Sequence, residues 1–148
     1  MILLVFTAGT AFAGRNVGTT AAATYTCSAA DRKFIDVARV NLPAFATWKD
    51  DFVGGGVDDT TFAAVAAETA ALMGRTSPQD RSLAQARLLV GAMLAEFGRA
   101  ASEREAGGLG AKPLLHAQEL DATLRGHFAE AAPGLAAAGC EISALFHL

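Results

Sequence analysis

The sequence predicts an all-α protein: an up-down-up-down four-helix bundle with a kinked first helix and a short C-terminal helical tail, its ends joined by one disulfide. Three observations lead to this prediction. Alanine, the best helix former, is the commonest residue, and runs of β-branched residues with a period of two are rare. Four segments carry apolar residues at helical spacing, with short connections between them. The two cysteines bracket these four segments.

Length and composition are those of one packed domain. The chain has 148 residues, of which 52% are hydrophobic and 18% charged, so a buried core is feasible. The net charge is −3, and the basic residues form no cluster. Nucleic acid is therefore not an expected partner.

The first residues predict export. The stretch MILLVFTAGTAFAG is apolar and ends in Ala11-Phe12-Ala13, which offers small residues where signal peptidase needs them. The apolar run is too short to span a bilayer, which needs about 20 residues. No Lys or Arg precedes it, so the n-region is atypical, and a buried N-terminal helix is the alternative. We expect a signal peptide over 1–13, a flexible mature tail over 14–27 and a helical-bundle domain over 28–148.

The first helix is expected to begin near Ala30 or Asp31 and to end at the glycines 54–56. Pro43 lies inside it and predicts a kink or a break near Leu42. Its apolar face follows spacings of four and three residues: Phe34, Ala38, Asn41, Phe45, Trp48 and Phe52.

The second and third helices have clear start signals. Asp58 or Asp59 can cap the second helix, and Gly74 can close it in the left-handed conformation. Thr69 lies on its buried stripe, where the hydroxyl can bond to a carbonyl one turn earlier. Asp80 is the expected cap of the third helix. Its buried face is expected to comprise Leu83, Ala86, Val90, Met93, Phe97 and Ala100.

The fourth helix is expected to open at Pro113 and to run to about Ala131, before Pro133 and Gly134. A short tail follows it. Three apolar residues of this tail are expected to cover the open end of the core: Ile142, Leu145 and Phe146.

Cys27 and Cys140 are predicted to form a disulfide. They are the only cysteines, and an isolated pair in an exported chain is normally bridged. An up-down-up-down bundle brings the start of its first helix and the end of its last helix to the same end. Closing so long a loop would stabilise the fold by about 4–5 kcal/mol.

The phrase His-x-x-Glu occurs twice in the fourth helix, at His116 and again at His127. At about 100° per residue both histidines fall on one edge of the buried stripe, about 16 Å apart, so one metal ion cannot bridge them. The preferred interpretation is a pair of boundary histidines, each with a carboxylate three residues later. The alternative is a haem or metal site that uses a histidine with Met73, Met93 or Tyr25.

Asn41 and Trp48 form a second candidate site on the first helix. A buried Asn41 amide needs a partner, and the simplest one is the backbone carbonyl freed by Pro43. The alternative is that Asn41 lines a small polar pocket beside Trp48.

No pattern indicates an enzyme, because G-x-S-x-G is absent and no histidine has a clear Ser or Cys partner. We therefore expect no catalytic residues, metal or cofactor. The expected function is a non-enzymatic binding or structural module that is secreted, periplasmic or in the cell envelope, with no stable membrane span after cleavage. Its partner would be an envelope protein or a small ligand, and its contact surface would be the apolar residues of the tail around Leu145 to Leu148. The alternative function is a haem or metal carrier that uses His116 and His127.

Two cysteines bracket a small helical domain that is expected to be exported. In this architecture alone, the chain resembles the haemophore-like secreted proteins of some bacteria. Their haem ligands match no positions here, so the resemblance implies no site residues.

Overall fold

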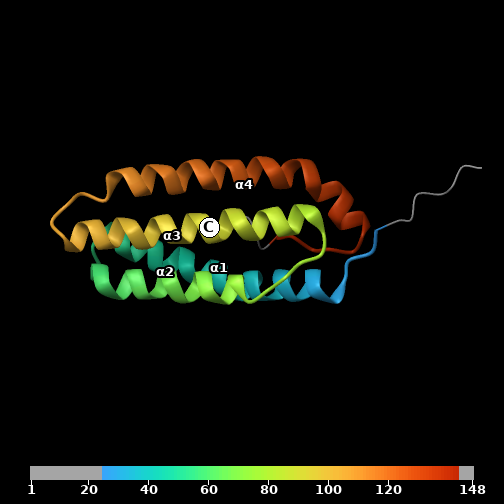
Figure 1. Ribbon diagram of the computed structural model, residues 1–148, viewed down its shortest axis with the longest axis horizontal. Helices are drawn as coiled ribbons and strands as arrows, with labels where there is room; N and C mark the ends of the chain where they lie inside the picture. Colours follow the sequence, from blue (N-terminus) through green and yellow to red (C-terminus); the bar gives the residue numbers. More distant parts are fainter. Residues whose placement is uncertain (1–24, 144–148) are drawn as a thin grey trace, which may run out of the picture.

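A computed structural model describes residues 25–143, which form four α-helices packed against each other (Figure 1). They are α1 (Ala29–Gly54), α2 (Asp59–Gly74), α3 (Arg81–Glu105) and α4 (Ala111–Ala137). The described part of the chain contains no strand, so the all-α prediction is confirmed. The predicted signal peptide, most of the predicted tail and the apolar residues 145–148 lie outside the described residues.

The helix α3 is central to the packing. It packs closely against both α2 and α4, while α1 packs against α2 and only sparsely against α3. In Figure 1, α2, α3 and α4 lie side by side, and most of α1 lies behind α2 and α3. Consecutive helices run in opposite directions in this view, so α1 begins at the end of the molecule where α4 finishes.

Three of the four helices, α1, α2 and α3, begin where a polar side chain accepts from their free amides. Ser28 caps α1 and forms a capping box with Asp31, in which each side chain accepts from the other residue's backbone amide. Asp58 caps α2 through the amide of Thr61, and Asp80 caps α3 through the amide of Leu83. The caps predicted at Asp58 and Asp80 are therefore confirmed.

The prolines interrupt the helices less than the sequence predicts. A kink or a break was expected near Leu42. The break does not occur, because α1 continues through Pro43 to Gly54, and the kink stays a prediction. The expected end of α4 near Ala131 is also wrong, because α4 continues through Pro133 to Ala137. Pro43 and Pro133 are both exposed, so each ring lies toward solvent while the rest of the helix keeps its packing.

Gly74 does not close α2 in the left-handed conformation. The cap residue is Arg75, with φ −77°, and the positive-φ glycines of the described residues lie elsewhere. One of them is Gly55, the cap residue of α1, with φ 77°. Left-handed glycines also follow α3 and α4, at Gly107 and Gly139, so the left-handed ending expected of α2 is wrong for that helix alone.

Phenylalanine rings fill the core between α1, α2 and α3. Phe52 stacks on Phe62 with ring centroids 4.0 Å apart, and Phe45 contacts Phe97 edge-on at 5.4 Å. The predicted buried face of α3 is confirmed in full, and Thr69 donates to the Val65 carbonyl as expected. On α1 the predicted face is buried at Phe34, Ala38, Phe45 and Phe52.

Covalent and polar contacts join the helix ends at one end of the molecule. The predicted disulfide between Cys27 and Cys140 is present, with Cα atoms 5.3 Å apart and 113 residues of separation. Beside it, the Cys27 amide donates to the Ala138 carbonyl at 2.9 Å. The segment before α1 is thereby held to the segment after α4.

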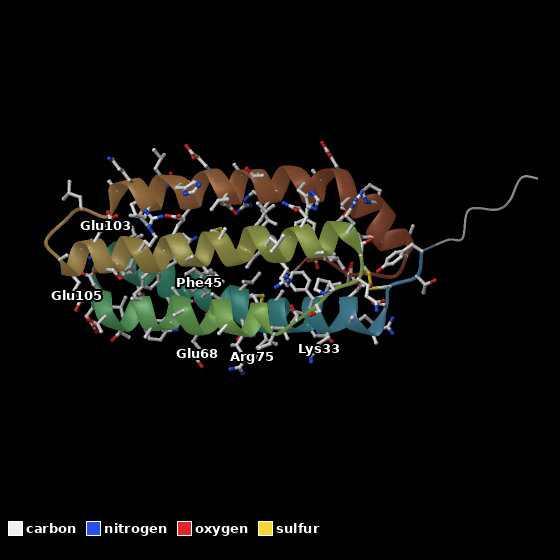
Figure 2. The ribbon with its side chains drawn as sticks, viewed as in Figure 1. Lys33, Phe45, Glu68, Arg75, Glu103 and Glu105 are labelled. Atoms are coloured by element: carbon white, nitrogen blue, oxygen red, sulfur yellow. A yellow bond between two sulfur atoms is a disulfide. The ribbon has the colours of Figure 1, made fainter. Side chains whose placement is uncertain are left out.

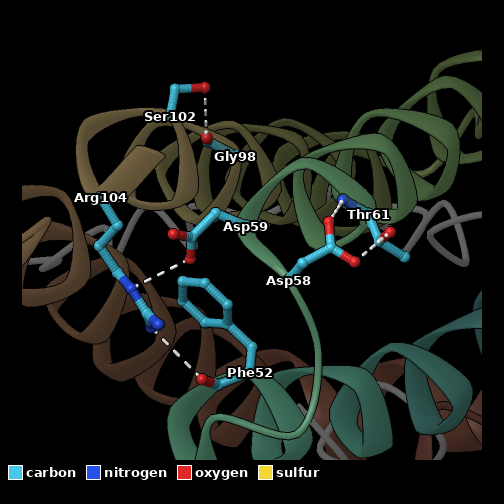
Figure 3. A network of polar contacts seen from close by, with 7 residues as sticks. All are labelled: Phe52, Asp58, Asp59, Thr61, Gly98, Ser102 and Arg104. Atoms are coloured by element: carbon cyan, nitrogen blue, oxygen red, sulfur yellow. Dashed lines mark hydrogen bonds and ion pairs between the residues drawn. The ribbon is translucent and has the colours of Figure 1, made fainter. Parts of the chain in front are cut away.

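At the other end, Arg104 of α3 joins α1 to α2 (Figure 3). Its guanidinium lies over the Phe52 ring, 4.1 Å from the centroid, and donates to the Phe52 carbonyl at 3.3 Å. The same group forms an ion pair with Asp59 at 3.1 Å. Three helix ends therefore meet at one side chain.

Candidate ligand pocket between α1, α3 and α4

A pocket of about 300 Å³ opens between α1, α3 and α4. Its floor consists of buried apolar side chains, including Phe45, Met93, Phe97 and Ala117. Its rim carries more exposed and polar side chains. The complete lining is Phe45, Lys49, Val53, Met93, Phe97, Leu114, Ala117, Gln118 and Asp121. Its size is at the lower limit of small-molecule sites, which are mostly apolar with a few placed polar groups.

Helical periodicity brings these residues together. On α1, Phe45, Lys49 and Val53 follow each other at intervals of four residues, and on α3 Met93 and Phe97 do the same. On α4, Leu114 is followed at three, four and seven residues by the other lining residues. Residues so spaced lie on one face of a helix, so each helix presents a single row to the pocket.

The pocket lies on the side of the bundle where the helices are least closely packed. The helix α4 packs against α3, and α1 packs against α2, but α1 and α4 are not a closely packed pair. The disulfide joins their chain segments only at the far end, beyond the start of α1. The apolar floor is thus reachable from the α1–α4 side.

The rim contains two opposite charges with different surroundings. Asp121 forms an ion pair with Arg125 at 2.8 Å, one turn further along α4. Lys49 is half-buried and has no hydrogen bond or ion pair with any described residue. Lys49 is therefore the one charged residue of the lining that forms no ion pair within the described part of the chain.

The pocket residues predicted on α1 are neighbours of the observed ones. Asn41 and Trp48 do not line the pocket. The Asn41 amide donates to the Val37 carbonyl at 2.7 Å, one turn earlier, and not to the Arg39 carbonyl that Pro43 leaves free. Trp48 is 38% exposed. Figure 2 shows Phe45 between the helices, while Lys33, Glu68 and Arg75 point away from them.

His116 pairs across helices. Its Nδ1 lies 3.1 Å from Glu96 Oε1 on α3, so its partner is not the expected carboxylate of Glu119. Glu96 is only 8% exposed, and Arg99 also donates to its Oε1, at 2.8 Å. The second oxygen, Oε2, is buried and has no hydrogen-bond partner among the described residues. Glu96 directly precedes the buried Phe97 on α3, and the sequence analysis did not predict that it is buried.

His127 also bonds to α3. Its Nε2 lies 2.9 Å from the Ser82 carbonyl, and the expected pairing with Glu130 is not observed. Within residues 25–143, no three His, Cys, Asp or Glu side chains are grouped as metal ligands would be. The structure therefore brings neither histidine into a ligand cluster within this part of the chain.

A separate polar centre surrounds the fully buried Asp31 near the disulfide. Its Oδ1 accepts from the amides of Gln79 and Asp80 at 2.7 and 2.9 Å. Its Oδ2 accepts from the Ser28 amide and hydroxyl and from the Tyr25 hydroxyl. Burial alone would raise the pKa of Asp31, but these hydrogen bonds outweigh it and hold the pKa well below its usual range. Burial and the Asp31 carboxylate raise the pKa of Tyr25 to about 12.

Two further hollows have a different character. One lies between α2 and α3 and is lined mainly by small side chains such as Ala63, Ala67, Ala95 and Gly98. The other lies near Tyr25 and has acidic groups, Asp80 and Glu130, in its lining. Neither is lined by buried phenylalanines, as the first pocket is by Phe45 and Phe97.

Sequence reasoning missed Lys49, Val53, Gln118 and Asp121. A signal for one of them was present, because Lys49 lies four residues after Phe45 and three before Phe52, both on the buried face. A charge beside a buried stripe can mark a pocket rim, although such lysines commonly place their stems along apolar surface.

Taken together, these features define an all-α protein closed by a disulfide, with an apolar pocket on its open side. Comparison of the chain with protein-family models, curated proteins and solved structures found no match. In residues 25–143, no helix is both long and apolar enough to cross a membrane.

Proposed function

We propose that this protein is a small exported, non-enzymatic binding module that holds a small apolar ligand in the pocket between α1, α3 and α4. One observation supports the proposal above the others. Buried aromatic and aliphatic side chains form the floor of an accessible pocket of about 300 Å³, and only three polar residues line it.

Export is the second part of the proposal. The apolar start of the chain and its small residues before Gly14 support it, as does the disulfide, which persists in oxidising compartments. We take the helices as an up-down-up-down bundle, with the disulfide at the end away from the pocket. The expected location is the periplasm, the cell envelope or the medium.

A cavity-filling variant tests the binding site. We expect 1-octanol to bind the wild-type protein with a Kd of about 0.1–1 mM, taking about 0.5 kcal/mol per non-hydrogen atom. Ala117→Leu adds bulk at the pocket floor and should weaken this binding at least about tenfold. Ala95→Leu adds the same bulk in the groove between α2 and α3 and should leave binding unchanged. Equal binding by both variants, or none by the wild type, would contradict the proposal.

Native mass spectrometry tests the export and carrier hypotheses on one sample. The protein would be exported by a bacterial host and purified without chelators. We expect cleavage after Ala13 and a mass about two units below the reduced value, from one disulfide. A retained haem or metal whose loading is abolished in His116→Ala or His127→Ala would instead support the carrier alternative.

A further inference from the structure

We infer that the ligand of this pocket is an amphiphile with one anionic head, such as a medium-chain carboxylate, whose head group is held by Lys49. The inference rests on the proposed function and adds the chemical class of the ligand.

The charges of the rim support an anion. Asp121 already has a cationic partner in Arg125, whereas Lys49 has no partner among residues 25–143. A bound carboxylate would give the ammonium group of Lys49 an opposite charge. It would lie at the rim, where its remaining oxygen lone pairs stay in contact with water.

The shape of the lining supports an amphiphile and not a free anion. The row on α1 runs from buried Phe45 through half-buried Lys49 to Val53, which is 69% exposed. The ligand's apolar body would lie on Phe45, Met93 and Phe97, which a small hydrated anion could not use. The side-chain amide of Gln118, exposed on the α4 side, can donate a second hydrogen bond to the head group.

Three probes with the same alkyl chain separate the head group from the body. Octanoate, 1-octanol and octylammonium chloride would be titrated into the full chain at pH 7 and low salt, with binding followed by calorimetry. We expect octanoate to bind at least about fivefold more tightly than octylammonium, the ratio that about 1 kcal/mol of partly exposed charge pairing gives. Added salt should weaken the binding of octanoate and leave the binding of octanol unchanged.

Lys49→Met keeps an apolar stem and removes the charge. This substitution should weaken the binding of octanoate about fivefold and leave the binding of octanol unchanged. Retained octanol binding also shows that the variant is folded. Lys33→Met, at an exposed lysine of the same helix, is the matched control and should change neither.

Two failures can be told apart. In the first case octanol binds, but octylammonium binds as tightly as octanoate or more tightly, or Lys49→Met leaves the affinity for octanoate unchanged. The anionic class of ligand is then wrong, while the pocket remains a binding site. If none of the three probes binds, the proposed function fails, and this inference fails with it.

Discussion

The carboxylate of Asp31 joins two helix starts that are distant in sequence. It accepts from Ser28 in the capping box of α1 and from the amides of Gln79 and Asp80 just before α3. A buried charge is tolerated only when such bonds replace its water. The same bonds that lower its pKa therefore fix the start of α1 against the start of α3.

Asp31→Asn should destabilise the fold by about 2–3 kcal/mol, because an amide replaces one acceptor oxygen with a donor. Urea unfolding at pH 7 would measure this loss. Asp36→Asn is the control. It removes an exposed ion pair with Arg39 and should change stability by less than about 1 kcal/mol. Equal losses in the two variants would contradict the role of Asp31.

The lowered pKa of Asp31 also predicts a pH dependence. Its contribution is fully present above the unfolded-state pKa of about 3.9 and is lost as pH falls further toward the folded-state pKa. The unfolding free energy should therefore fall below about pH 4 in the wild type. The fall should be smaller in Asp31→Asn. Parallel acid curves for the two proteins would contradict this account.

The helices themselves were largely predictable from the sequence. Periodicity and the caps Asp58 and Asp80 located α2 and α3. All six residues predicted for the buried face of α3 are buried, but the burial of Leu94, Glu96 and Ala101 was not predicted. Two of the errors concern Pro43 and Pro133, where local sequence favours a break but tertiary packing keeps the helix continuous. An exposed proline removes one backbone hydrogen bond without disturbing the packed face, so the core contacts on both sides outweigh it.

Pro43→Ala should raise the stability of the protein by about 1–2 kcal/mol. Alanine restores the backbone hydrogen bond to the Arg39 carbonyl. The free energy gained in the helix exceeds the loss that comes from the greater conformational entropy of the unfolded chain. Thermal unfolding would measure the change. Pro133→Ala, also exposed within a helix, should act in the same direction. A lower melting temperature in both variants would show that α1 and α4 need their prolines.

The candidate site was much less predictable than the helices. A single sequence gives the face of each helix, but not which helices separate enough to leave a pocket. Asn41 and Trp48 were the residues predicted on α1, whereas the lining residues of that helix are Phe45, Lys49 and Val53. Trp48 directly precedes Lys49 in the sequence. His116 was placed correctly on an edge, yet its partner Glu96 belongs to another helix and cannot be read from spacing along α4.

The whole molecule is closed covalently at one end and open along one side. The disulfide joins two residues that are 113 positions apart, so its loop contains nearly the whole described chain. Its loss removes the covalent link between the segments before α1 and after α4, which the Cys27–Ala138 hydrogen bond would still join. Packing between α1 and α4 can replace little of this link.

The double variant Cys27→Ser/Cys140→Ser should therefore lose about 4–5 kcal/mol of unfolding free energy, as chain entropy predicts for a loop of this length. Urea unfolding of the oxidised wild type and the double variant would measure the difference. The wild type under reducing conditions should follow the double variant. A loss below about 1 kcal/mol would mean that other contacts hold the ends.

We propose that the apolar pocket between α1, α3 and α4 is the binding site of this protein. The most direct test is an amide NMR titration of the assigned protein with 1-octanol. We predict that the saturable shifts gather at Phe45, Lys49, Met93, Phe97 and Ala117. Shifts that gather instead at Ala63, Ala67 and Ala95 between α2 and α3, or no saturable shifts at all, would contradict the claim.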